Sequence, residues 1–165
     1  MLKKLKISSG WGWLWITVVV LLLDQATKYF AVHFLQVYTP VTVAPFFSFT
    51  LAFNKGAAFS FLDNASGWQT WLFGSIAIIV SVLVLIWLKF LAFKQRWMGI
   101  ALCLILGGAL GNLWDRIYLG HVIDFIDFHF SYWHYPAFNI ADSAICIGAI
   151  MILCDALFNQ KRPNR

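Results

Sequence analysis

The chain has 165 residues, of which 61% are hydrophobic, and its mean hydropathy of +0.77 lies above the range of soluble globular proteins. The net charge of +5 does not indicate a nucleic-acid surface, because most basic residues lie in three tight groups that each flank an apolar run. Composition therefore excludes a soluble nucleic-acid-binding domain and indicates an integral membrane protein with no nucleic-acid partner.

Four segments are long and apolar enough to cross a bilayer, which takes roughly 20 residues. They cover about 11–35, 68–90, 97–114 and 138–158. The first follows a lysine cluster, as the core of a cleavable signal peptide does, but no small-residue cleavage site comes after it and the chain stays apolar. We therefore interpret it as a retained span, and residues 1–165 as a single membrane domain.

The basic groups predict the orientation of these spans. They are Lys3, Lys4 and Lys6, then Lys89, Lys94 and Arg96, then Lys161, Arg162 and Arg165. Because such residues collect on the cytoplasmic side, both termini are predicted to lie in the cytoplasm. The connections 36–67 and 115–137 then face outward. The predicted fold class is a membrane all-α protein with four transmembrane helices, N-in and C-in, and a small outer β-sheet.

The evidence for that sheet lies in the first outer connection. In TVAPFFSFTLAF (42–53), the side chains of Phe47, Phe49, Leu51 and Phe53 alternate with smaller ones. This period of two predicts a strand with one face buried. The turn signal Asn-Lys-Gly follows at 54–56.

The carboxylates are the informative feature for function. All seven are aspartates, and four of them lie between the third and fourth spans or at their edges: Asp115, Asp124, Asp127 and Asp142. Ionisable groups at the edge of hydrocarbon are costly and tend to pair or to do chemistry. Two aspartates brought together share one proton, so one can take a proton from water while the other protonates a scissile carbonyl oxygen. The cluster therefore predicts an acid–base protease site.

Each polar residue near the spans also has a structural interpretation. Asp142 can cap the fourth helix, Asp124 and Asp127 can lie in a loop or a strand, and Asp24 and Lys28 can neutralise each other on one face of the first helix. Asn54 can be a turn residue, and Asp115 and Arg116 can be an interfacial charge pair. Asn112 is a buried amide that needs a partner, and Asn139 lies three residues before Asp142.

Other hydrolytic chemistries lack their motifs in this chain. It has neither the HExxH of zinc proteases nor the Gly-x-Ser-x-Gly of serine hydrolases. The histidines at 121, 129 and 134 have no zinc-type spacing, and we interpret them as interfacial residues. The three cysteines lie inside apolar runs and are interpreted as packing residues. No metal and no cofactor is predicted.

Five motifs together resemble the bacterial lipoprotein signal peptidase (type II signal peptidase) family. They are DQATK (24–28), NKGAAF (54–59), GNLWDR (111–116), VIDFIDF (122–128) and FNIADSAI (138–145), in the family's order and over essentially the whole chain. The resemblance implies a multi-pass aspartic endopeptidase of the bacterial inner membrane, with its active site at the periplasmic face beneath the sheet and an outer loop. Its substrates would be prolipoproteins that carry diacylglycerol on a cysteine, cut just before that cysteine.

The resemblance also implies roles for individual residues. It places the catalytic dyad at Asp124 and Asp142, whereas Asp127 is not catalytic by this match. The residues implied to hold the substrate backbone and the dyad are Asn54, Asn112, Arg116 and Asn139, and those implied to be structural supports behind them are Asp24, Lys28 and Asp115. Membrane lipids and globomycin-type cyclic peptides are the other implied ligands, and a monomer is expected.

Two alternatives stand beside the peptidase. A small proton-coupled transporter could use Asp24 and Asp142 as relay carboxylates, although such relays usually lie near the midplane between repeated halves, and this chain has no visible repeat. A non-catalytic assembly or chaperone protein of the membrane would tolerate loss of either aspartate.

Overall fold

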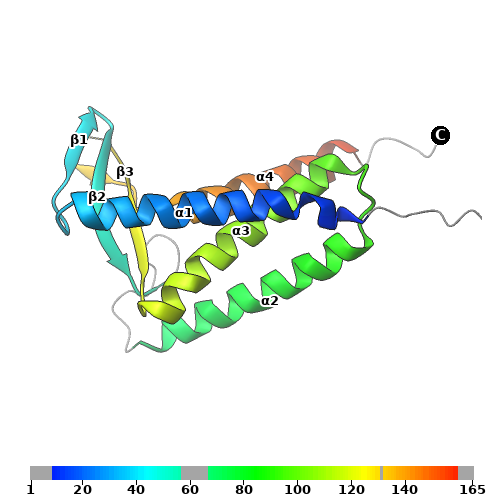
Figure 1. Cartoon of the computed structure of the whole chain (residues 1–165). Helices are drawn as coiled ribbons and strands as arrows, with labels where there is room; N and C mark the ends of the chain where they lie inside the picture. Colours follow the sequence, from blue (N-terminus) through cyan, green and yellow to red (C-terminus); the bar gives the residue numbers. More distant parts are fainter. Residues whose placement is uncertain (1–8, 57–66, 131, 160–165) are drawn as a thin grey trace, which may run out of the picture.

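The computed structural model describes residues 9–56, 67–130 and 132–159, and shows a four-helix bundle with a small sheet across one end (Figure 1). Its helical segments are the 3₁₀ turn η1 (Gly10–Trp13), α1 (Leu14–Phe34), α2 (Trp68–Phe90), α3 (Arg96–Tyr118) and α4 (Ile140–Asn159). All four long helices are apolar enough to cross a membrane. The predicted fold class, four membrane helices with a small sheet, is confirmed.

The orientation of the bundle in the membrane stays a prediction. The basic groups at 3–6 and 161–165 lie outside the described residues. Figure 1 shows that the start of α1, the α2–α3 connection and the end of α4 lie together at the end of the bundle opposite the sheet. This arrangement is the one that four consecutive crossings produce, and it separates the remaining basic group, around Lys89 to Arg96, from the sheet.

Helix α3 is the buried member of the bundle, and small residues allow its neighbours to approach closely. A Cβ atom on Gly108 would collide with the backbone oxygen of Ala141 in α4. One on Gly111 would come within 2.6 Å of the Asp24 carboxylate of α1. The glycines of α3 therefore bring the first turn of α4 and the polar part of α1 to the same level of the bundle.

Helix α3 is also longer than the sequence predicted. The apolar pattern ends at Trp114, but the helix continues to Tyr118, so Asp115 and Arg116 lie within it and not in the outer connection. Both polar side chains have partners on other elements, Lys28 of α1 for Asp115 and Gly56 for Arg116. The hydropathy of one helix does not reveal such partners.

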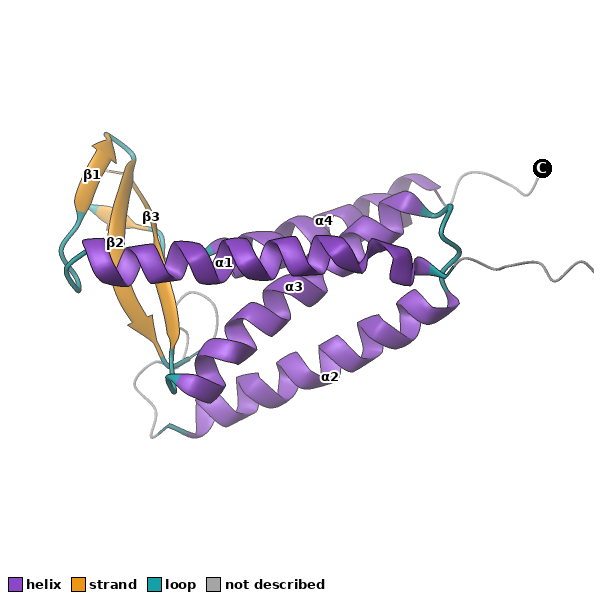
Figure 2. Ribbon diagram, in the orientation of Figure 1, coloured by secondary structure: helices purple, strands orange, loops and turns teal. Residues whose placement is uncertain are grey.

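The sheet has four antiparallel strands in the order β1-β2-β3-β4 (Figure 2). The strands are β1 (Val41–Ala44), β2 (Phe47–Asn54), β3 (Val122–Phe130) and β4 (Trp133–His134). The segment predicted as one strand over 42–53 is thus a hairpin. The predicted alternation in β2 is wrong, because its buried residues are Ser48, Leu51 and Asn54, three residues apart, and the register shifts between Phe49 and Ala52. A bulge of this kind turns successive side chains away from strict alternation.

Two contacts position the sheet over the helix ends. Leu51 of β2 and Phe125 of β3 pack with Ala31 of α1 in one buried apolar cluster. Phe138, two residues before the start of α4, joins β3, since Phe138 and Ile126 exchange backbone hydrogen bonds of 2.8 and 3.1 Å. This pairing brings the beginning of α4 beside β3, and with it the two sequence segments that carry the candidate aspartates.

Candidate active site

Asp124 of β3 and Asp142 in the first turn of α4 come together at the boundary between the sheet and the bundle. Both are buried, with exposed fractions of 1% and 8%. The sequence left open whether Asp124 lies in a loop or a strand, and the structure places it in a strand. The two residues most strongly implicated by the sequence are therefore neighbours in space.

Asn139 links the two aspartates. Its side-chain Nδ2 donates to Asp124 Oδ1 at 2.8 Å. Its Oδ1 accepts the backbone N–H of Asp142 at 2.9 Å, while Asp142 Oδ2 accepts the backbone N–H of Asn139 at 3.3 Å. The last two bonds form a reciprocal capping box at the start of α4. The structural interpretation of Asp142 as a helix-capping residue is thus correct, and the same side chain also faces the site.

Asn54 holds the other oxygen of Asp124. Its Nδ2 donates to Asp124 Oδ2 at 3.0 Å, and its Oδ1 accepts the backbone N–H of Gly56 at 2.9 Å. The second bond is an Asx turn, which orients the amide. Asn54 is therefore both the turn residue and the dyad contact that the sequence offered as separate possibilities.

Asn112 of α3 occupies the corresponding position next to Asp142. Its Nδ2 donates to Asp142 Oδ1 at 2.7 Å, and its Oδ1 accepts a hydrogen bond of 2.9 Å from the ammonium of Lys28. The buried amide expected to need a partner has one on each side. Through it the dyad is connected to the polar residues of α1.

The environment of Asp124 favours its protonated form. Burial raises its pKa from the usual 3.8 to about 7, the nearby charge of Asp142 acts in the same direction, and the amide of Asn54 opposes both. The amides supply donors to the carboxylates, so an ionised member is stabilised while the other keeps its proton. The pair can therefore hold one proton and one charge near neutral pH, the state that acid–base hydrolysis requires.

A buried ion triad lies behind the dyad. Lys28 Nζ lies 2.8 Å from Asp24 Oδ2 and 2.8 Å from Asp115 Oδ2. The predicted pair of Asp24 with Lys28 is present, whereas the predicted pair of Asp115 with Arg116 is wrong, because Asp115 points across to α1. Asp24 Oδ1 also accepts the backbone N–H of Ala141 at 2.9 Å and so ties α1 to the start of α4.

Gln25 is a member of this network that sequence reasoning missed. Its Nε2 donates to Asp115 Oδ1 at 3.0 Å and to Asp24 Oδ2 at 3.2 Å. The available signal was its place in the chain, because residues 24, 25 and 28 fall on one side of a mostly apolar helix.

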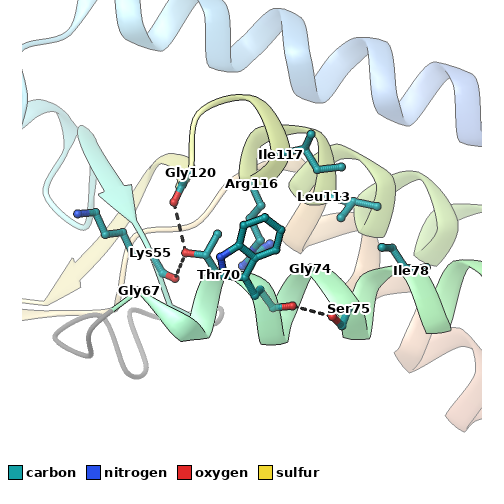
Figure 3. A pocket seen from close by; sticks show the side chains of 11 residues that line it. Lys55, Gly67, Thr70, Gly74, Ser75, Ile78, Leu113, Arg116, Ile117 and Gly120 are labelled. Carbon is teal, nitrogen blue, oxygen red and sulfur yellow. Dashed lines mark hydrogen bonds between the residues drawn. The ribbon is translucent and has the colours of Figure 1, made fainter.

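Arg116 connects the site to a cavity. Its guanidinium donates to the backbone oxygens of Gly56 at 2.9 Å and of Asn112 at 3.2 Å, and its Nε has no acceptor among the described residues. It lines a cavity of about 470 Å³ between α2 and α3, shown in Figure 3. The other walls are mostly apolar: Trp71, Ile78, Leu113 and Ile117, with Lys55, Thr70 and Ser75 among the polar residues.

Asp127 belongs to a different cluster. Its carboxylate accepts hydrogen bonds from Thr50 Oγ1 at 2.8 Å and contacts His134 Nδ1 at 2.9 Å. His129 contacts Ser48 Oγ at 3.0 Å through Nε2, and the ring of His121 packs on Phe53. These contacts join the strands of the sheet. Spacing along the chain could not separate Asp127 from Asp124, but the structure places Asp124 alone beside Asp142.

Comparison with known proteins agrees with this geometry. The family model described as signal peptidase (SPase) II matches residues 16–158. The lipoprotein signal peptidase of Pseudomonas aeruginosa (strain PAO1) is 55% identical over 147 residues, which cover 88% of this chain and 86% of that protein. That of Pseudomonas putida (strain KT2440) is 53% identical over 147 residues, covering 88% and 85%. A solved bacterial membrane enzyme, 34% identical, superposes with a TM-score of 0.81 over 93% of each chain. The chain belongs to the signal peptidase II family of aspartic peptidases.

Proposed function

We propose that this chain removes the signal peptide from diacylglyceryl-modified prolipoproteins, cutting just before the lipidated cysteine, with Asp124 and Asp142 as its catalytic dyad. The observation that carries the proposal is the joint burial of these two aspartates at one level of a membrane bundle, with Asn139 hydrogen-bonded to both. The relatives named lipoprotein signal peptidase support the choice of substrate.

The chemistry follows from the shared proton of the dyad. A water held between the carboxylates would lose a proton to the ionised aspartate while it attacks the scissile carbonyl carbon, and the protonated aspartate would protonate the carbonyl oxygen. A site from which bulk water is excluded strengthens both electrostatic effects. The amides of Asn54, Asn112 and Asn139 hold the two carboxylates for this reaction.

The cavity between α2 and α3 is the proposed docking place for the substrate chain next to the cleaved bond. Its apolar walls suit a segment that arrives through the bilayer, and Arg116 lies in both the cavity wall and the polar surroundings of the dyad.

The site is proposed to lie at the periplasmic face of the inner membrane. The basic group at Lys89 to Arg96 lies at the opposite end of the bundle from the sheet, which supports this orientation. The outer connection 36–67, whose strand and turn are expected to cover the site, is described as far as Gly56, and its part 57–66 lies outside the described residues. The enzyme is proposed to work as a monomer among membrane lipids and to be blocked by globomycin-type cyclic peptides that compete for the dyad.

A cleavage assay tests the proposal. The purified protein in detergent is incubated with a diacylglyceryl-modified prolipoprotein, and release of the signal peptide is followed by gel shift. Wild type should cleave, whereas Asp124→Asn and Asp142→Asn should fold and fail to cleave. Asp127→Asn is the matched control, an aspartate of the same strand that should retain cleavage. No cleavage by wild type of a verified lipidated substrate would contradict the proposed function.

A further inference from the structure

The ammonium of Lys28 has one acceptor for each of its three N–H groups. Its Nζ lies 2.8 Å from Asp24 Oδ2, 2.8 Å from Asp115 Oδ2 and 2.9 Å from Asn112 Oδ1. A lysine ammonium carries three donors, so it cannot turn without breaking one of these contacts. The side chain is 2% exposed. Lys28 is therefore a buried, fixed charge, and its third hydrogen bond leads toward the dyad.

That third bond determines which way the amide of Asn112 faces. An ammonium can only approach the oxygen of an amide, and this oxygen also accepts Asn139 Nδ2 at 3.1 Å. The NH₂ group of Asn112 must then face Asp142, whose Oδ1 it reaches at 2.7 Å. This length is typical of an N–H bonded to an ionised carboxylate. An amide whose oxygen is bound to a cation is polarised, which makes its N–H the stronger donor.

The two aspartates also differ in their backbone surroundings. Asp142 lies in the first turn of α4 and accepts the backbone N–H of Asn139, and the positive end of a helix stabilises an anion. Asp124 lies on a β-strand, which has no comparable dipole. Both features, the helix start at Asp142 and the strand at Asp124, place the negative charge on Asp142 and leave the proton to Asp124.

We infer that Lys28 is a positioning residue that assigns the roles within the dyad: by orienting Asn112 it keeps Asp142 ionised as the base, and Asp124 is left as the acid. This inference rests on the proposed function. Water would add to the carbonyl carbon as its proton passes to Asp142, while the proton of Asp124 passes to the carbonyl oxygen. When the C–N bond breaks, the leaving nitrogen takes the proton from Asp142, and a hydroxyl of the tetrahedral intermediate returns a proton to Asp124.

The test uses two changes that break the link at different points. Lys28→Met combined with Asp115→Asn removes the ammonium and keeps the net charge of the triad at −1, since two carboxylates and one ammonium become one carboxylate. Asn112→Leu removes the amide and leaves the triad intact. In both, kcat should fall roughly tenfold or more, about 1.4 kcal/mol in the barrier, and KM should not change. The acidic limb of the pH–kcat/KM profile should move to higher pH, because the ionised base has lost its donor.

Gln25→Leu is the matched control, because Gln25 bonds to Asp24 and Asp115 but not to Asn112, and its pH profile should keep the wild-type acidic limb. Adding Asn112→Leu to the double variant should not shift the acidic limb further, because both changes interrupt the same contacts from Lys28 through Asn112 to Asp142. An unmoved acidic limb in Asn112→Leu, which does not depend on the folding of the Lys28 variant, would overturn the inference. Failure of wild type to cleave would instead count against the proposed function.

Discussion

Asn139 and Asp142 exchange two hydrogen bonds across the first turn of α4, one in each direction between side chain and backbone. The same asparagine reaches Asp124 with its amide nitrogen. A motif that elsewhere only begins a helix thus also fixes the separation of two catalytic candidates. Helix capping and dyad geometry are therefore coupled here through one residue.

Two substitutions of Asn139 should separate these roles. Asn139→Ala removes the cap and should cost about 1 kcal/mol of stability, whereas Asn139→Ser keeps a good N-cap and should cost much less. Both lose the amide that reaches Asp124, so both should cleave poorly. Thermal unfolding in detergent and the cleavage assay measure the two effects. A serine variant with full activity would show that the bond to Asp124 is dispensable.

The pKa of Asp124 predicts a pH-dependent stability. The carboxyl ionises near 3.8 when unfolded and at about 7 in the folded protein, so the folded state binds the proton more tightly. The resulting stabilisation is complete below pH 4 and is lost as the pH rises to 7, by at most roughly 4 kcal/mol. The difference in Tm between Asp124→Asn and wild type should therefore grow in favour of the variant from pH 4 to 7. A difference that is constant with pH would contradict the raised pKa.

The proposed docking cavity predicts a contrast between two adjacent isoleucines. Ile78 lines the cavity, whereas Ile79, similarly exposed on α2, does not. Ile78→Trp should fill the space and raise KM for the lipidated substrate with a smaller effect on kcat, because uniform binding is lost. Ile79→Trp should leave both parameters near wild type. Equal effects from the two tryptophans would argue against substrate binding between α2 and α3.

Close packing of α3 on α4 gives a prediction for Gly108. A methyl group there would collide with Ala141 O, so Gly108→Ala should displace the start of α4, lower Tm and reduce cleavage. Gly74→Ala in α2 is the stability control, since its methyl group would meet only Leu113 Cδ1 at 3.8 Å. That change should be neutral or raise stability by about 0.5–1 kcal/mol. Wild-type Tm in Gly108→Ala would show that the helices can separate without cost.

The sequence predicted best the long apolar helices and the segments that carry recognisable motifs. Four apolar runs predicted four helices, and the motif order placed Asp124 and Asp142 together. The errors lie where a partner on another element decides the structure. Helix α3 extends through Asp115 because Lys28 of α1 neutralises it, and β2 buries Ser48 because its hydroxyl bonds to Thr42 and contacts His129. Gln25 was overlooked because two of its acceptors, Asp115 and the backbone oxygen of Gly111, lie on another helix.

The hydrogen bond between the Asp24 carboxylate and α4 has a consequence for biosynthesis. Asp24 is in the first span, yet it accepts the backbone N–H of Ala141 in the last. The dyad likewise draws on a strand that precedes the last span and on an amide of the third. Because ribosomes make the chain from the N-terminus, this constellation cannot exist until the final helix has entered the bilayer. A peptidase assembled in that order has no active site while it is still a nascent chain, and a product truncated before Asn139 would be inert.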